Sequence, residues 1–203
     1  KNGIVFLGMN GYAHDEANAL NRYNRDAGGA KTVTPSKDQD EVTKSGVKYD
    51  LTTVEGAASF IATLGMPDQM AVDAADFLLN AGSGARDELG SFIQILAEAE
   101  MGERQIDRMV LSGHSVGSQI WGDDNGEIAM NDFDKLSDIF PKAFGQVQHL
   151  MLSACYSGGE TNMMSNKGIW EGAESIWAYH DSSPGTWSGA MGHMEEWESA
   201  TES

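Results

Sequence analysis

Two stretches of this chain follow the same plan, RMVLSGH over residues 108–114 and HLMLSAC over residues 149–155. Each begins with a run of apolar side chains and then passes through small residues to a side chain that can do chemistry. A short apolar run bounded by small residues is typical of a buried strand. The sequence therefore predicts two buried strands, one leading to His114 and the other to Cys155.

Further strands and helices are predicted on both sides of this pair. Apolar runs predict strands over residues 3–9, 31–34 and 175–179. Apolar side chains that recur with a period near 3.6 predict helices over residues 15–23, 54–64, 68–80, 86–100 and 132–144, and in the tail from residue 187. Strands that alternate with helices in this way are typical of a parallel sheet with helices packed against it.

We therefore expect a single α/β domain over residues 1–203, built on an open, mostly parallel sheet with helices on both faces. The polar residues 35–50 are expected to form an exposed loop. Asn125-Gly126 predicts a small hairpin after the histidine strand. Because the chain opens at Lys1 without a methionine, a longer or processed parent is a further hypothesis.

The charge balance is strongly acidic, with 31 aspartates and glutamates against 13 lysines and arginines and a formal net charge of −18. A negative field repels nucleic acid and anionic membranes, so neither is expected as a main partner. No apolar run approaches the roughly 18 residues of a membrane span, and no signal segment opens the chain, which favours a cytoplasmic location. The single cysteine excludes an internal disulfide, and no histidine has metal-ligand spacing with it, so we expect no metal and no organic cofactor.

The carboxyl ends of the two central strands are the place where chemistry is expected, because ligands of open α/β sheets bind there. If the strands are neighbours, the His114 imidazole and the Cys155 sulfur open onto the same edge of the sheet. A free thiol has a pKa of about 8.5, and a nearby imidazole raises the thiolate fraction or takes the proton during attack. The sequence thus predicts Cys155 as nucleophile and His114 as acid–base, with the backbone N–H groups of Ser115 and Cys155 as the oxyanion hole.

The segment from residue 109 to residue 159 resembles the catalytic core of the caspase-like (clan CD) cysteine peptidases. This group includes caspases, metacaspases, legumains, clostripains and CHAT-domain proteases. Its pattern is an apolar strand that ends in Ser-Gly-His-Gly, a short hairpin, a helix, and an apolar strand that ends in Ala-Cys-x-Ser/Thr-Gly. Here residues 111–114 read LSGH and residues 152–158 read LSACYSG, which is most similar to the CHAT version. The element order over residues 3–180 resembles the family's six-strand sheet through its fifth strand.

The resemblance implies a cysteine endopeptidase that hydrolyses protein substrates through a thioester on Cys155. It also implies that the chain could be a zymogen, held or released by an activating or inhibitory partner or by a pro-segment. The resemblance gives no metal or organic cofactor a part in the chemistry.

The chain departs from the family at several positions. Ser115 stands where a glycine usually follows the histidine, and Ser153 stands where clostripain-like proteases and metacaspases carry the aspartate of the S1 pocket. A preference for Arg or Lys at P1 is therefore not carried over from the family. Asp181 is a candidate substitute acid near the substrate, and Trp177 is a candidate for the substrate wall. The P1 preference, the natural substrate and the activator stay open.

Two other functions stay open at this point. Residues 113–117 read GHSVG and match the G-x-S-x-G nucleophile elbow of α/β-hydrolases, which would make Ser115 the nucleophile of a serine esterase. The elbow must run straight into a helix, however, and residues 118–126 contain two glycines and a turn signal, a poor composition for a helix. A non-enzymatic scaffold with a caspase-like fold is the third function, although both catalytic positions are filled.

Overall fold

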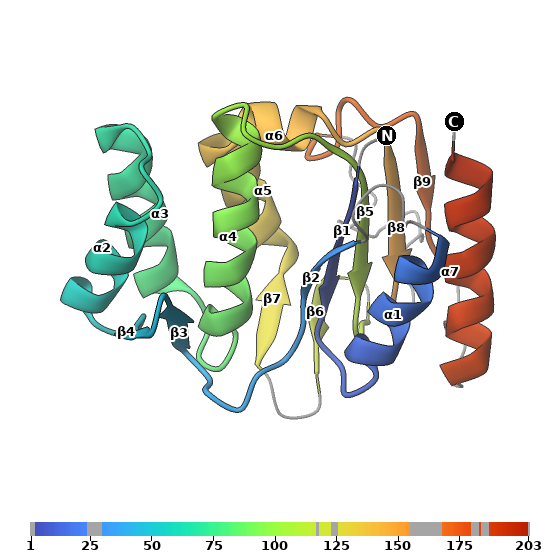
Figure 1. The fold of residues 1–203 in the computed structure, drawn as a ribbon, viewed down its shortest axis with the longest axis horizontal. Coiled ribbons are helices and arrows are strands. Elements are labelled where there is room, and N and C mark those ends of the chain that lie inside the picture. Colours follow the sequence, from blue (N-terminus) through green and yellow to red (C-terminus); the bar gives the residue numbers. More distant parts are fainter. Residues whose placement is uncertain are drawn as a thin grey trace.

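The fold is built on a central sheet of five strands, all parallel, in the order β2-β1-β5-β8-β9 (Figure 1). The structure is a computed structural model, and it describes residues 3–23, 30–116, 118–122, 126–154, 168–179, 183 and 187–202. The strands of this sheet are β1 (Gly3–Gly8), β2 (Lys31–Val33), β5 (Ile106–Ser112), β8 (His149–Ser153) and β9 (Ser175–Trp177). The predicted α/β class with a parallel sheet is confirmed.

Helices cover both faces of the sheet, as predicted (Figure 1). One face carries α1 (Ala13–Tyr23) and α7 (Trp187–Thr201), which pack against each other. The other face carries three helices, namely α4 (Arg86–Glu100), α5 (Met130–Ile139) and α6 (Pro141–Gly145). Two more helices, α2 (Val54–Ala62) and α3 (Asp68–Asn80), form an outer layer in which α3 contacts α4 and α5.

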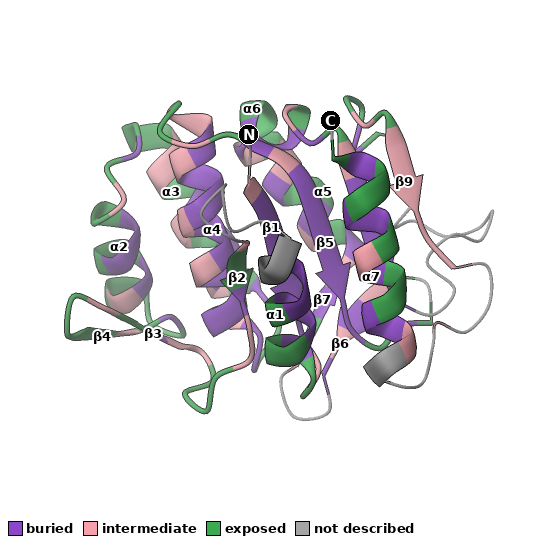
Figure 2. Ribbon diagram, turned by 45° about the vertical axis from the view of Figure 1, so that its right-hand side comes forward, coloured by how far each residue is buried: buried purple, intermediate pink, exposed green. Residues whose placement is uncertain are grey.

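Alternation along the central strands explains why both faces are covered. Ile4, Phe6, Val110 and Met151 join one core with side chains of α1 and α7, such as Leu20 and Trp197. The residues between them face α4 to α6 and join the larger core, namely Val5, Leu7, Met109, Leu111, Leu150 and Leu152. In Figure 2 the central strands β1 and β5 are accordingly buried along most of their length. A parallel strand buried on both faces reads as a continuous apolar run.

The expected loop over residues 35–50 is wrong in its second half, because β3 (Glu41–Lys44) and β4 (Val47–Asp50) form an antiparallel hairpin there. Ser45 and Gly46 make its turn, with φ values of 52° and 78°. Such a turn suits a hairpin because its backbone twist matches that of the flanking strands. The predicted loop missed it because the two strands are mostly polar and bury only one side chain deeply, that of Val42.

The hairpin expected after the histidine strand is confirmed, with β6 (Gln119–Trp121) antiparallel to β7 (Glu127–Ala129). The predicted helix over residues 132–144 is two helices, α5 and α6, which meet at Phe140 and Pro141. Proline lacks the backbone N–H that would continue α5, and it suits the first turn of α6. No helix in the described part of the chain has the length and apolar character that a membrane span requires.

Glu88 of α4 is a buried carboxyl group, with only 1% of its surface exposed. Burial, together with the neighbouring Asp87, raises the pKa of Glu88 from 4.5 to about 10. The folded protein therefore keeps a proton that the unfolded chain releases above pH 4.5. Each pH unit between these two pKa values should lower the free energy of unfolding by at most about 1.4 kcal/mol.

We expect Glu88→Gln to remove this pH dependence, because glutamine has a similar shape and does not ionise. Urea unfolding at pH 5.0 and pH 7.5 should show the variant gaining stability over the wild type as the pH rises. Glu103→Gln, at an exposed glutamate, is the control and should show no such gain. A Glu88→Gln protein that loses the same stability as the wild type between the two pH values would contradict this assignment.

Candidate active site

The end of β5 and the end of β8 lie side by side, in register. Ser112 pairs with Ser153, and the backbone N–H of Gly113 donates to the carbonyl oxygen of Ser153 at 3.3 Å. The expectation that the histidine strand and the cysteine strand are parallel neighbours is therefore confirmed. The carboxyl ends of both strands lie at the same edge of the sheet, the lower edge in Figure 1.

His114 lies at this edge with its backbone held by the β6–β7 hairpin. Its N–H donates to the carbonyl oxygen of Trp121 at 2.9 Å, and its carbonyl oxygen accepts from the N–H of Trp121 at 3.1 Å. The imidazole of His114 and the indole of Trp121 are also neighbours, with ring centroids 6.1 Å apart and planes tilted by 40°. The side chain of His114 is exposed. An exposed imidazole on a fixed backbone can reach a substrate and exchange protons with it.

Of the other predicted site residues, two lie outside the described part of the chain and two lie at the strand ends. Cys155 and Asp181 lie outside the described residues, and Ala154 is the last described residue before the cysteine. Ser115 and Ser153 are described and buried, with 5% and 6% of their surface exposed. The structure thus brings His114 and Ser115 to the strand end that carries Ser153.

Trp177 lies one strand away, on β9, where it pairs with Met151 of β8. Its side chain is half-buried and packs against the core formed with α1 and α7. Its part in a substrate wall stays a prediction.

Sequence reasoning missed a buried carboxyl group next to this edge, that of Glu16 on α1. Ser112 Oγ donates to Glu16 Oε2 at 2.8 Å, and only 4% of Glu16 is exposed. Burial raises the pKa of Glu16, although hydrogen bonds from Ser112 and Asn10 act in the opposite direction. One signal could have found it, because Glu16 lies at helical spacing with Ala13 and Leu20 on the apolar side of α1.

A shallow, open cavity of about 580 Å³ lies at the β6–β7 hairpin, and its lining residue Trp121 contacts His114. The β6–β7 hairpin contributes part of the lining, with Trp121 and Glu127 among its residues, and the turn at Gly82 and Ser83 contributes another part. A volume of this size is within the range of ligand sites. Trp121 lines the cavity and also forms two backbone hydrogen bonds with His114, so one residue connects the cavity to the candidate acid–base.

Close backbone packing holds these two parts of the cavity lining together. Gly126 has a φ of 68°, and a Cβ atom there would lie 2.5 Å from the carbonyl oxygen of Ser83. The turn that contains Ser83 is itself fixed, because the Asp40 carboxylate accepts from the backbone N–H of Gly84 at 2.9 Å. Asp40 also forms an ion pair with Arg86 at 3.2 Å. Only glycine at position 126 allows the hairpin to approach this turn so closely.

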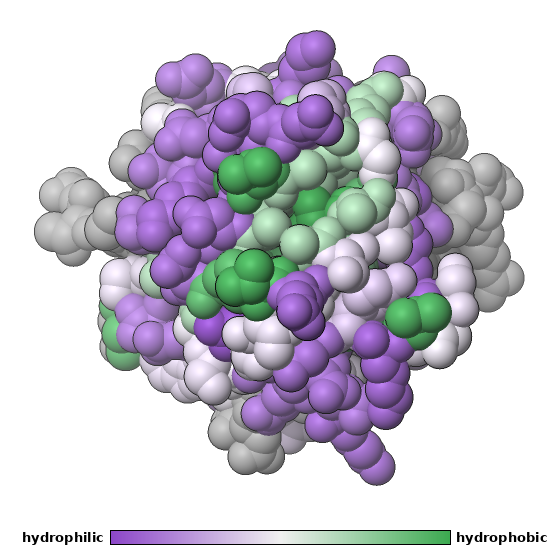
Figure 3. Space-filling model, turned by 90° about the vertical axis from the view of Figure 1, so that its left-hand side faces the viewer, coloured by the Kyte–Doolittle hydropathy of each residue, from purple (hydrophilic) through white to green (hydrophobic). Residues whose placement is uncertain are grey.

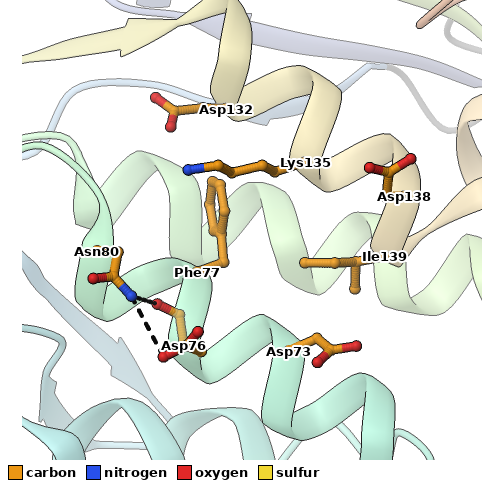
Figure 4. Close-up of a pocket in the computed structure, with 8 residues that line it drawn as sticks. All are labelled: Asp73, Asp76, Phe77, Asn80, Asp132, Lys135, Asp138 and Ile139. Carbon is orange, nitrogen blue, oxygen red and sulfur yellow. Dashed lines mark hydrogen bonds between the residues drawn. The ribbon is translucent and has the colours of Figure 1, made fainter.

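A second cavity, of about 320 Å³, lies between α3 and α5 (Figure 4). Four aspartates surround Phe77, Ile139 and Lys135, and they are Asp73, Asp76, Asp132 and Asp138. Two of these carboxylates already accept hydrogen bonds from residues of their own helix or its N-terminal end. Asp76 accepts from the side-chain amide of Asn80, and Asp132 accepts from the backbone N–H of Ala129 at 2.9 Å. Among the described residues, no Ser, Thr, Cys or His lines this cavity, so it offers neither a hydroxyl or thiol nucleophile nor an imidazole base.

The outer helices carry an apolar strip. Figure 3 shows apolar and weakly polar side chains gathered at the centre of this face, bordered by hydrophilic ones. Val54 of α2 and Val72 of α3 are exposed, with 70% and 62% of their surfaces accessible.

The described residues contain no cluster of three His, Cys, Asp or Glu side chains that could hold a metal ion.

No protein-family model, no curated protein and no solved structure matches this chain. The residues at the sheet edge therefore carry the functional argument by themselves.

We expect Gly126→Ala to loosen the hairpin that holds His114, because the new Cβ meets backbone atoms at a left-handed φ. Gly46→Ala is the matched control, since Gly46 has a φ of 78° but no atom within 4 Å of its Cβ position. The control should cost about 1 kcal/mol of stability and Gly126→Ala about 2 to 4 kcal/mol. Equal losses in urea unfolding would contradict the close packing described here.

Proposed function

We propose that this chain is a cysteine endopeptidase with Cys155 as its nucleophile and His114 as its acid–base. The observation that carries the proposal is the parallel pairing of β5 with β8, in register at Ser112 and Ser153. One strand leads to the imidazole after two residues, and the other leads to the cysteine after two residues. The two strands therefore end at the same level of the same edge of the sheet.

The chemistry follows from these two groups. His114 takes the proton of the Cys155 thiol as the sulfur attacks the carbonyl carbon of the scissile peptide bond. The carbonyl oxygen becomes an oxyanion, for which the backbone N–H groups of Ser115 and Cys155 are the proposed donors. The C–N bond then breaks, His114 gives its proton to the leaving amine, and a thioester remains on the cysteine. A water molecule, deprotonated by the imidazole, hydrolyses this thioester and frees the thiol.

Further support for a caspase-like peptidase comes from the order of elements. The histidine strand is followed by a short hairpin, a helical segment (α5 and α6) and the strand that leads to the cysteine, which is similar to the family pattern. The strand order β2-β1-β5-β8-β9 alone is less informative, because other doubly wound sheets share such an order. The residues at the strand ends therefore weigh more in this proposal than the topology.

The serine esterase is less well supported than the cysteine peptidase. A nucleophile elbow needs a helix directly after the serine, whereas β6 begins at Gln119, four residues after Ser115. Ser115 is also 5% exposed, which leaves little of it open to a substrate. Protein substrates and control by a partner or pro-segment remain part of the proposal through the family resemblance.

Cleavage of a peptide library should test the proposal directly. The wild type should cut peptides, Cys155→Ala should lose all measurable cleavage, and His114→Ala should lose about 10²- to 10⁴-fold in kcat/KM. Ser115→Ala should keep at least a tenth of the activity, because its backbone N–H remains. Far-UV circular dichroism should show that all variants are folded.

Two outcomes would count against the proposal. Full cleavage by Cys155→Ala, with loss in Ser115→Ala, would assign the activity to the serine. A folded wild type that cuts no peptide, with or without limited proteolysis to release a pro-segment, would favour the scaffold.

A further inference from the structure

The cavity at the β6–β7 hairpin is positioned to meet a substrate side chain. It is lined by the hairpin and by the turn that contains Gly82 and Ser83. Two backbone hydrogen bonds join His114 to Trp121, and Trp121 itself lines the cavity. A peptide bound at the candidate acid–base would therefore have a neighbouring side chain within reach of this space.

The hairpin presents two chemically different faces. Ile120 and Ile128 pair across the strands, and both are fully buried in the main core. Trp121 and Glu127 are also direct partners across the strands, so their side chains share the opposite face. Both of these residues line the cavity. The hairpin's contribution to the cavity lining thus includes an aromatic and an acidic residue that are cross-strand neighbours.

This pair favours a long side chain with a positive end. The half-buried indole of Trp121 offers an apolar face to an aliphatic stem and attracts a cation above its ring. Glu127, the exposed cross-strand partner of Trp121, supplies the opposite charge. The net charge of −18 raises the local concentration of basic peptides and repels acidic ones.

We infer that the cavity binds a lysine or arginine side chain of the peptide substrate, with Trp121 as its wall and Glu127 as its counter-charge. This inference rests on the proposed peptidase function and adds a substrate class to it. The site lies on the hairpin after the histidine strand, so it is separate from the strand position held by Ser153.

The test uses pairs of fluorogenic peptides that differ at one position, with arginine in one and the neutral isostere citrulline in the other. Each position around the scissile bond is compared in turn by kcat/KM. The wild type should prefer arginine by at least about tenfold at one position. Glu127→Gln should reduce this arginine-to-citrulline ratio by about tenfold, mainly through KM. Asp138→Asn, which removes the same charge from the second cavity, should keep the wild-type ratio.

Binding separates this inference from the proposed function. Fluorescence anisotropy can measure the affinity of the cleavage-deficient Cys155→Ala protein for the arginine and citrulline peptides, with and without Glu127→Gln. Arginine-selective binding that depends on Glu127, in a wild type that cuts nothing, would keep the basic subsite and reject the peptidase. Cysteine-dependent cleavage with an arginine-to-citrulline ratio unchanged by Glu127→Gln would keep the peptidase and overturn the subsite. Absence of any preference for arginine in both assays would overturn it as well.

Discussion

The parallel pairing of β5 with β8 is the constraint on which the rest of this structure depends. Both strands are buried on both faces, so their side chains alternate between two cores: Val110 and Met151 face α1 and α7, while Leu111 and Leu152 face α4 to α6. A slip of one residue would exchange the two sets, and side chains fitted to one core would enter the other. The packing therefore specifies the register, and this register places the last residues of β5 and β8, Ser112 and Ser153, directly beside each other.

Local backbone chemistry then shapes the edge that the strands define. The hairpin β6–β7 holds His114 through Trp121, and Gly126 lets that hairpin approach the turn fixed by Asp40. The two hydrogen bonds between His114 and Trp121 join backbone groups, which do not change with side-chain rotamers. The side chains of His114 and Glu127 are exposed on this frame, where a ligand can contact them.

The sequence predicted the features that arise from local patterns and missed those that arise from register or distance. Apolar runs located β5 and β8 within two residues, because burial on both faces leaves a continuous signal. The β3–β4 hairpin carries no such signal, since Val42 is its one deeply buried side chain. The Glu16–Ser112 hydrogen bond joins residues 96 positions apart, and the Trp121–Glu127 pair depends on hairpin register. Cys155, predicted from its strand-end motif, and Asp181, predicted from its place after the following strand, lie outside the described residues.

The central claim, that the sheet sets the Cys155 thiol beside the His114 imidazole, has a direct chemical readout because the chain contains one cysteine. The rate of alkylation by iodoacetamide at pH 7.0, followed by intact mass, measures that thiol alone. We predict that the wild type reacts about ten times faster, or more, than a folded His114→Gln variant, because the imidazole increases the thiolate fraction of the cysteine. Equal rates in the two proteins, both close to that of a free thiol with a pKa of about 8.5, would contradict it.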